Sequence, residues 1–165
     1  MHKRFSLFIF LIFLCINSFA QLTGKVVGIA DGDSFTLLTD SLTQIKIRLH
    51  GVDCPEKNQA FGQKAKEFTS DFIFGKRVRV KVTDIDRYNR VIGIVTLRTG
   101  KNLNEALLKN GFAWHYKQYD KSKKYSQIEE SARIAKKGLW IDKNPTAPWD
   151  FRKNQRNSKK KTNKK

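Results

Sequence analysis

The chain has 165 residues, with 33 Lys and Arg against 15 Asp and Glu, and its net charge is +18. Its length allows one ordinary domain with a single core and excludes two. The charge indicates a polyanionic partner, for which nucleic acid fits better than an anionic membrane surface, because a strong positive field attracts phosphates without sequence preference.

Residues 1–20 have the pattern of a cleaved signal peptide. Lys3 and Arg4 precede an apolar run, and small residues close the segment before Ala20. The run is short for a bilayer span, so a retained anchor is the weaker alternative, and no later segment reaches the roughly 20 apolar residues of a transmembrane helix. The sequence predicts cleavage after Ala20 and export, either to the periplasm or to the medium. Cys54 is then the one remaining cysteine, which excludes an internal disulfide.

Five short runs beyond the signal peptide have strand character. They are rich in Val, Ile and Phe, are separated by turn residues, and cover 25–30, 34–38, 44–49, 77–83 and 91–97. Asp31-Gly32 predicts a hairpin turn between the first two runs. Aliphatic and basic residues alternate in the third run, so Arg48 is predicted to point away from its aliphatic face.

Helical spacing replaces strand spacing in three segments. An amphipathic helix is predicted over 60–74 with Gly75 at its end. A shorter helix starts after Asn102, which forms a capping-box pattern with Glu105, and a third covers 126–137. Five strands with a helix between the third and fourth predict an α+β fold that is mainly β barrel. We expect a five-stranded OB-fold barrel with about three α-helices, a fold whose open face often binds nucleic acids.

The character of the chain changes after Trp149. Residues 152–165 hold eight Lys or Arg, no acidic residue and no aliphatic residue. A segment of this composition cannot bury apolar surface. The predicted organisation is therefore a signal peptide over 1–20, one domain over 21–150, and a basic disordered tail over 151–165. The tail is either a solvated segment or a loose tether for nucleic acid.

Two acidic clusters stand out in this acid-poor chain. One is the DGD of residues 31–33 at the predicted hairpin, and the other is the DCPE of residues 53–56 after the third strand. Carboxylates from two converging loops could hold a hard divalent cation such as calcium, which prefers oxygen ligands. Arg48 and Arg90 lie beside or opposite these loops, and arginine suits phosphate through its rigid charged fork. The combination is typical of phosphodiester cleavage, where water loses a proton while negative charge builds on phosphoryl oxygens.

Four stretches of the chain together resemble the staphylococcal nuclease, or thermonuclease, family. They are IADGDS at 29–34, IRLHGVDCPE at 47–56, DRYNR at 86–90, and LNEAL at 103–107 followed by Gly111. All four occur in the family's order and spacing, and the resemblance covers most of residues 24–142. It implies a calcium-dependent, sugar-nonspecific endonuclease that hydrolyses phosphodiester bonds of DNA and RNA and leaves 3′-phosphate ends.

The resemblance also implies a role for each matched residue. The calcium ligands would be the side chains of Asp33 and Asp53 and the backbone carbonyl of Cys54. The catalytic residues would be Glu56, the general base that activates water, with Arg48 and Arg90, which bind the phosphate and stabilise its transition state. The substrate-binding residues would be Arg87 and Tyr88 near a second phosphate, and Trp114 and Tyr116 near the family's base-stacking positions.

The chain departs from the best-known member at a few positions. Cys54 and Ser34 replace threonines, and the segment between Glu56 and Phe61 is shorter. Asn89 replaces a glycine, which is compatible with a turn because asparagine tolerates left-handed backbone angles. For Asp31, local hydrogen bonding within its turn is favoured over a metal contact.

Other residues leave alternatives open. Arg87, Tyr88, Trp114 and Tyr116 are as compatible with packing as with substrate binding. His50 and His115 are interpreted as structural or surface residues, because no His or Cys spacing here resembles a zinc site.

Two alternatives to an enzyme remain. A non-catalytic nucleic-acid-binding OB module would need no general base, and a basic envelope-attached protein would need no converging carboxylates. The partners expected are DNA and RNA, single-stranded or as loosened duplex, bound by an exported monomer without a membrane span.

Overall fold

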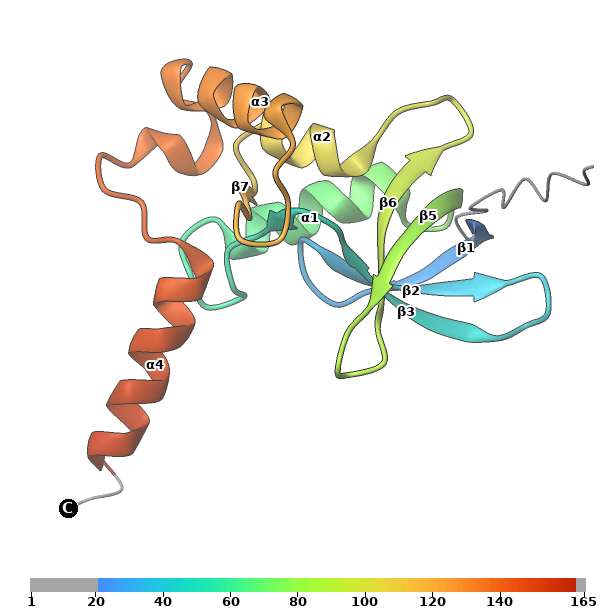
Figure 1. Cartoon of the computed structure of the whole chain (residues 1–165), viewed down its shortest axis with the longest axis horizontal. Helices are drawn as coiled ribbons and strands as arrows, with labels where there is room; N and C mark the ends of the chain where they lie inside the picture. The colour runs from blue at the N-terminus through green and yellow to red at the C-terminus, as the bar shows by residue number, and fades with distance from the viewer. Residues whose placement is uncertain (1–20, 163–165) are drawn as a thin grey trace, which may run out of the picture.

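The computed structural model describes residues 21–162, which form a closed five-stranded barrel with helices to one side of it (Figure 1). The barrel strands are β1 (Gln21–Ile29), β2 (Ser34–Thr39), β3 (Gln44–Leu49), β5 (Arg77–Ile85) and β6 (Val91–Leu97). They close in the order β1-β2-β3-β6-β5. The pairs are antiparallel except for β3 and β6, which run parallel. The predicted OB-fold barrel is confirmed, whereas the predicted signal peptide lies outside the described residues.

β1 begins earlier than its apolar pattern indicated. Its first residues, Gln21–Lys25, pair with Lys81–Arg77 of β5, while residues from Gly24 onward pair with β2. Backbone pairing on both sides extends this strand through a polar stretch, because the ladder needs N–H and C=O groups rather than apolar side chains. This double pairing of β1 closes the barrel.

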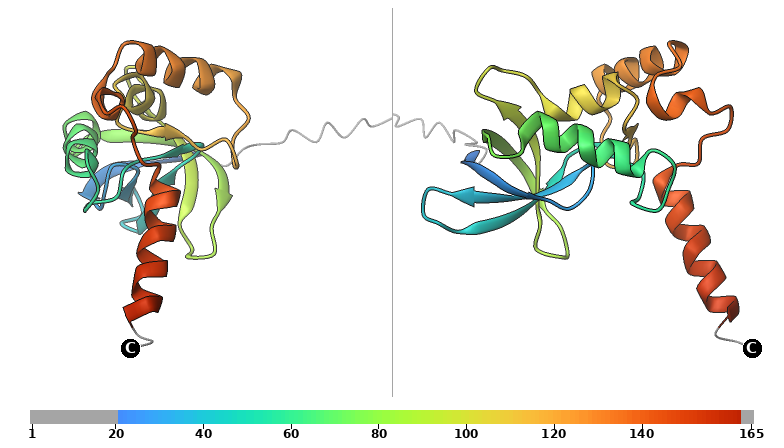
Figure 2. Two further views of the ribbon diagram at one scale, coloured as in Figure 1. Left: turned by 90° about the vertical axis from the view of Figure 1, so that its left-hand side faces the viewer. Right: turned by 180° about the vertical axis from the view of Figure 1, so that it is seen from behind.

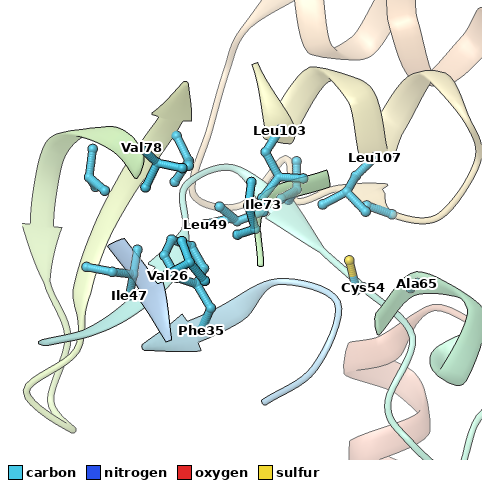
Figure 3. Close-up of a cluster of buried hydrophobic side chains, with 14 of the residues drawn as sticks. Val26, Phe35, Ile47, Leu49, Cys54, Ala65, Ile73, Val78, Leu103 and Leu107 are labelled. Carbon is cyan, nitrogen blue, oxygen red and sulfur yellow. The ribbon is translucent and has the colours of Figure 1, made fainter. Parts of the chain in front are cut away.

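Alternate residues of the strands fill the barrel interior (Figure 3). The side chains with at most 2% exposure include Val26, Phe35, Leu37, Ile47, Leu49, Val78, Val80 and Val95. Ile47 and Leu49 point inward on β3, so the pleat turns Arg48 to the opposite face. The prediction for Arg48 is confirmed.

Four α-helices lie within the described residues: α1 (Gly62–Ile73), α2 (Leu103–Lys109), α3 (Lys123–Ile134) and α4 (Pro148–Thr162). Asn102 caps α2 by accepting a hydrogen bond from the Glu105 backbone N–H at 3.2 Å, as its capping-box pattern predicted. α3 starts before the predicted residue 126, because Ser122 caps it by accepting from the Tyr125 backbone N–H. A 3₁₀ turn, η1 (Gly138–Ile141), follows α3.

A second, two-stranded sheet lies beside the barrel. It pairs β4 (Val52–Asp53) with β7 (Trp114–His115) in antiparallel register. The sheet places the segment after α2 against the segment after β3, although they are far apart in the sequence.

A helix takes the place of the disordered tail expected from residue 151 onward. α4 extends away from the barrel, and its end is distant from the rest of the molecule in every view (Figures 1 and 2). Lys, Arg and Gln are good helix formers, and Ala147 and Pro148 are buried at the start of the helix. Composition alone did not reveal that anchored first turn. Along residues 21–162, no helix combines the length and the apolar character needed to cross a bilayer.

Candidate active site

The loop between β1 and β2 presents Asp33 toward the loop after β4. The Asp33 backbone N–H donates to Asp31 Oδ1 at 3.1 Å, which confirms the predicted local hydrogen bond of Asp31. Asp33 is only 2% exposed. Its Oδ2 accepts a hydrogen bond from the Cys54 backbone N–H at 2.8 Å, so the two acidic loops are joined directly.

Arg48 links the two carboxylates that the sequence singled out. Its Nη1 lies 2.9 Å from Asp33 Oδ1 and its Nη2 lies 2.6 Å from Asp53 Oδ1. The charge of Asp33, opposed by burial and reinforced by Asp53, raises the pKa of Arg48. The structure thus brings Asp33, Asp53 and Arg48 into one cluster.

The carboxylates of this cluster carry negative charge in a buried place. Asp53 is fully buried on β4, and burial raises its pKa even though Arg48 and Arg152 oppose that shift. Burial, with the Asp33 charge beside it, raises the pKa of Asp31 to about 7. Burying carboxylates is unfavourable unless cations compensate them, so the cluster favours additional positive charge.

The donor set suits a hard cation. Among residues 21–162, no three His, Cys, Asp or Glu side chains gather in an arrangement that could hold a metal ion. Calcium also accepts backbone carbonyls and water as ligands, so two carboxylates can supply the protein's side-chain share of a site. Burial raises the pKa of the Cys54 thiol well above its usual range, so Cys54 can offer its backbone rather than a thiolate.

Glu56 lies in a tight loop between β4 and α1. The Glu56 carbonyl accepts from the Gln59 backbone N–H at 2.8 Å, and Gln59 Oε1 accepts from the Glu56 N–H at 3.1 Å. A Cβ at Gly62 would collide with the Glu56 carbonyl, so the start of α1 can approach this closely only with glycine. The Glu56 side chain is 39% exposed, which leaves it accessible to water.

Arg152, from the first turns of α4, also enters the cluster. Its Nη1 lies 2.6 Å from Glu56 Oε1 and its Nη2 lies 2.7 Å from Asp53 Oδ2. Although burial opposes it, hydrogen bonding to Asp53 and Glu56 raises the pKa of Arg152. Sequence reasoning missed this residue because it lies in the basic tail. Trp149 and Phe151 just before it could have indicated that the helix start is anchored.

Arg90 occupies the turn between β5 and β6. Within the described residues its hydrogen-bonding partner is Asp86, with Nε donating to Oδ2 at 2.8 Å, rather than the carboxylate cluster. The parallel pairing of β3 with β6 sets Arg48 opposite Ile92, two residues past Arg90, so the turn lies beside β3. Asn89 in the same turn has a φ of 58°, a left-handed conformation that asparagine tolerates.

Arg87 and Tyr88 lie at the exposed tip of this turn. Arg87 Nη2 donates to the Tyr88 hydroxyl at 2.9 Å, and its guanidinium lies 4.9 Å from the Tyr88 ring centroid. Tyr88 is 65% exposed. These two residues are therefore accessible to a ligand. The hydrogen bond and the ring contact join them to each other rather than to Asp33 or Asp53.

Trp114 and Tyr116 form part of an aromatic surface next to Asp53. Trp114 pairs with Asp53 across the β4–β7 sheet. Tyr116 stacks on Trp149 with ring centroids 5.0 Å apart and planes at 11°. Burial and the charge of Asp53 raise the pKa of Tyr116. A cavity of about 300 Å³ beside these rings is lined also by Lys117 and Arg133.

His50 and His115, which the sequence indicated as structural or surface residues, both lie beside Asp120. Asp120 lies 2.8 Å from His115 Nε2 and 3.5 Å from His50 Nε2. His115 Nδ1 lies 3.1 Å from Ser126 Oγ, and His115 is 2% exposed. This cluster joins the ends of β3 and β7 to the first turn of α3.

Comparison with known proteins identifies the family. A family model described as staphylococcal nuclease homologue matches residues 46–142. An uncharacterized endonuclease of Haemophilus influenzae is 42% identical over 134 residues, which cover 81% of this chain and 75% of that protein. The chain belongs to the staphylococcal nuclease family. A micrococcal nuclease of Shigella flexneri is 34% identical over 155 residues, covering 87% of each chain. A probable staphylococcal-like nuclease of Oryza sativa subsp. japonica is 39% identical over 114 residues, which are 31% of that longer protein.

Membership of the staphylococcal nuclease family makes the chain a phosphodiester hydrolase, with nucleic acid as its class of substrate. The matched residues include Arg48, Asp53, Glu56 and Arg90. Asp33 precedes the matched range, but its bonds to Arg48 and to the Cys54 backbone tie it to the same cluster. Arg152, on α4, follows the matched range.

Proposed function

We propose that this member of the family is a calcium-dependent, sugar-nonspecific nuclease that hydrolyses DNA and RNA to 3′-phosphate products. The observation that carries the proposal is the cluster of two buried aspartates and one partly exposed glutamate, linked by two bridging arginines. Arg48 bonds both Asp33 and Asp53, and Glu56 shares Arg152 with Asp53. Such a cluster costs folding free energy, which favours a role in chemistry rather than in stability.

The proposed calcium ligands are the carboxylates of Asp33 and Asp53 and the backbone carbonyl of Cys54. All three donors are oxygen, which calcium prefers, and both carboxylates are buried. Bound calcium would supply positive charge to the phosphoryl oxygens and help to orient the attacking water.

Glu56 is the proposed general base. It is the exposed carboxylate of the cluster and can accept a proton from a water next to the phosphate. The neutral Cys54 thiol and the paired His50 and His115 side chains are poor candidates for that role. Proton transfer is therefore assigned to Glu56 Oε atoms.

Two arginines are assigned to the phosphate. Arg48 presents a fork whose nitrogen atoms already bond carboxylate oxygens, and the same donors can bind phosphoryl oxygens. Arg90 is held by Asp86 in the neighbouring turn and is proposed to stabilise negative charge on the departing 5′-oxygen.

The substrate would extend from the cluster in two directions. Arg87 and Tyr88, on the exposed turn, are proposed to contact a neighbouring phosphate. Trp114 and Tyr116 are proposed to contact bases, supported by the cavity beside them and by the basic residues that line it. Contacts to phosphate and aromatic stacking do not select a sugar, which is consistent with cleavage of both DNA and RNA.

The function can be tested on the protein lacking residues 1–20. Hydrolysis of single-stranded DNA is followed as acid-soluble product with calcium and then with excess chelator. We expect calcium-dependent release, and a fall of about 100-fold or more in kcat for Glu56→Gln. Glu130→Gln, which changes an exposed carboxylate on α3, is the matched control and should retain full activity.

The same assay decides against the alternative of a non-catalytic OB module. That module would bind DNA in a salt-sensitive way without cleaving it under either condition. Unchanged turnover in Glu56→Gln would refute the assignment of the base while leaving nuclease activity in place. Export, from the pattern of residues 1–20, remains a separate proposal. Mass spectrometry of the exported protein tests it, with Gln21 as the expected first residue.

A further inference from the structure

The first turns of α4 occupy two parts of the candidate active site at once. Arg152 donates to Glu56 Oε1 at 2.6 Å and to Asp53 Oδ2 at 2.7 Å, and a longer bond of 3.3 Å joins it to Asp53 Oδ1. Three residues earlier, Trp149 stacks on Tyr116. It also makes an edge-to-face contact with Trp114, with the ring centroids 5.6 Å apart. One helical turn therefore contacts the proposed metal ligand, the proposed base and the proposed base-stacking rings.

Arg152 bonds the same carboxylate oxygens that a divalent cation would need as ligands. Both oxygens of Asp53 are engaged by guanidinium nitrogens, Oδ1 by Arg48 and Oδ2 by Arg152. A cation bound to Asp53 would lie within a few ångströms of the Arg152 guanidinium, and like charges at that distance repel strongly in a partly buried site. The cation and Arg152 cannot both have their best contacts with Asp53.

The base and the aromatic rings are affected in the same way. Glu56 Oε1 already accepts a charge-assisted hydrogen bond, so it has to give up that bond before it can accept a proton from water. Trp149 covers the face of Tyr116 that it stacks on, so a nucleobase cannot stack there while α4 is docked.

We propose that α4 is an intramolecular competitor of the divalent cation and of nucleic acid. In the metal-free protein Arg152 serves as the counter-cation of Asp53 and Glu56, and Trp149 fills the aromatic surface. Binding of the cation displaces Arg152 and releases the helix. This inference rests on the proposed metal role of Asp53.

The residues of α4 that follow Arg152, 153–160, are exposed. Arg152 is 34% exposed in the docked state, and the side chains beyond it, such as Lys153, Arg156 and Lys159, are exposed. The far end of the helix extends away from the barrel (Figures 1 and 2). The docking contacts are therefore concentrated in the first turns of the helix, where a cation and a nucleobase can replace them.

Calcium binding measured by isothermal titration calorimetry tests the competition without any nuclease assay. Arg152→Gln should bind calcium about tenfold more tightly than the parent protein, the factor expected when one charge-assisted pair no longer has to be broken. Arg156→Gln removes the same charge one turn further along α4, where the side chain is exposed, and should bind as the parent does. Arg152→Lys, which retains the charge without the fork, should lie between them.

Nuclear magnetic resonance of arginine side chains provides a second readout. The Nε–H signal of Arg152, assigned by its loss in Arg152→Gln, should shift on addition of calcium, and the Arg156 signal should not. Equal calcium affinities for the parent protein and Arg152→Gln would overturn the competition while leaving a calcium-dependent nuclease intact. If Asp53→Asn binds calcium as tightly as the parent, the metal assignment itself fails, and the competition fails with it.

Discussion

Replacing Thr69 by valine isolates one hydrogen bond that supports the acidic loop. Thr69 is fully buried on α1, and its Oγ1 donates to the Gly32 carbonyl at 2.6 Å. Gly32 is the residue between Asp31 and Asp33, so this bond ties the loop to the helix. Valine has nearly the same shape but no donor, which leaves a buried carbonyl unsatisfied at a cost of about 2 kcal/mol in the free energy of unfolding.

Urea denaturation of the metal-free protein measures this loss. With a slope typical of small domains, about 2 kcal/mol per molar urea, the midpoint of Thr69→Val should fall by about 1 M at an unchanged slope. Thr43→Val, at an exposed position between β2 and β3, should change the free energy of unfolding by less than about 0.5 kcal/mol. A loss below that limit in Thr69→Val would refute the role of this hydrogen bond in holding the loop.

Three further changes test other parts of the structure. Arg90→Gln should lower kcat on single-stranded DNA about 100-fold, because the negative charge on the leaving oxygen loses its partner. Steady-state kinetics measure this effect, and a change confined to KM would contradict the proposed role of Arg90. Asn104→Ala should cost about 3 kcal/mol by calorimetry or urea denaturation, since it leaves the Val95 N–H and His50 carbonyl without the partners 3.0 and 2.8 Å away. Although slight desolvation opposes it, hydrogen bonds from the Arg90 and Tyr88 backbone N–H groups and the Arg90 guanidinium lower the pKa of Asp86 below its ordinary 3.8. A lowered folded-state pKa stabilises the protein above pH 3.8, and this stabilisation is lost as pH falls through the folded-state pKa. Asp86→Asn should therefore be less stable than the parent by about 1 kcal/mol at pH 7, and urea denaturation at decreasing pH should show this difference shrinking below pH 3.8.

Much of the site followed from local sequence. Asp33, Asp53 and Glu56 were identified because each lies in a short acidic motif at a turn or just past a strand, in a chain that is otherwise poor in acidic residues. Arg48 followed from the two-residue period of β3, since burial of Ile47 and Leu49 forces it to the other face. The capping box of α2 was equally local, and it is confirmed.

Long-range pairing required the tertiary structure. The β4–β7 sheet sets Trp114 beside Asp53, and the pairing of β1 with β5 closes the barrel through polar residues that no hydrophobic pattern could reveal. Contacts between residues so distant in sequence depend on the whole fold, which composition and periodicity do not encode.

The sequence by itself determined the barrel, its order of strands and helices, the basic charge, and the residue types gathered for phosphodiester chemistry, because these depend on local period, turn chemistry and composition. Only the tertiary structure decided what the C-terminal segment does. By composition residues 151–165 are a solvated tail, yet Trp149 anchors the helix on Tyr116 and Arg152 bonds Asp53 and Glu56. The physical reason is that the carboxylates of buried Asp53 and partly exposed Glu56 attract whichever cation the fold brings within reach, and that partner lies about a hundred residues further along the chain.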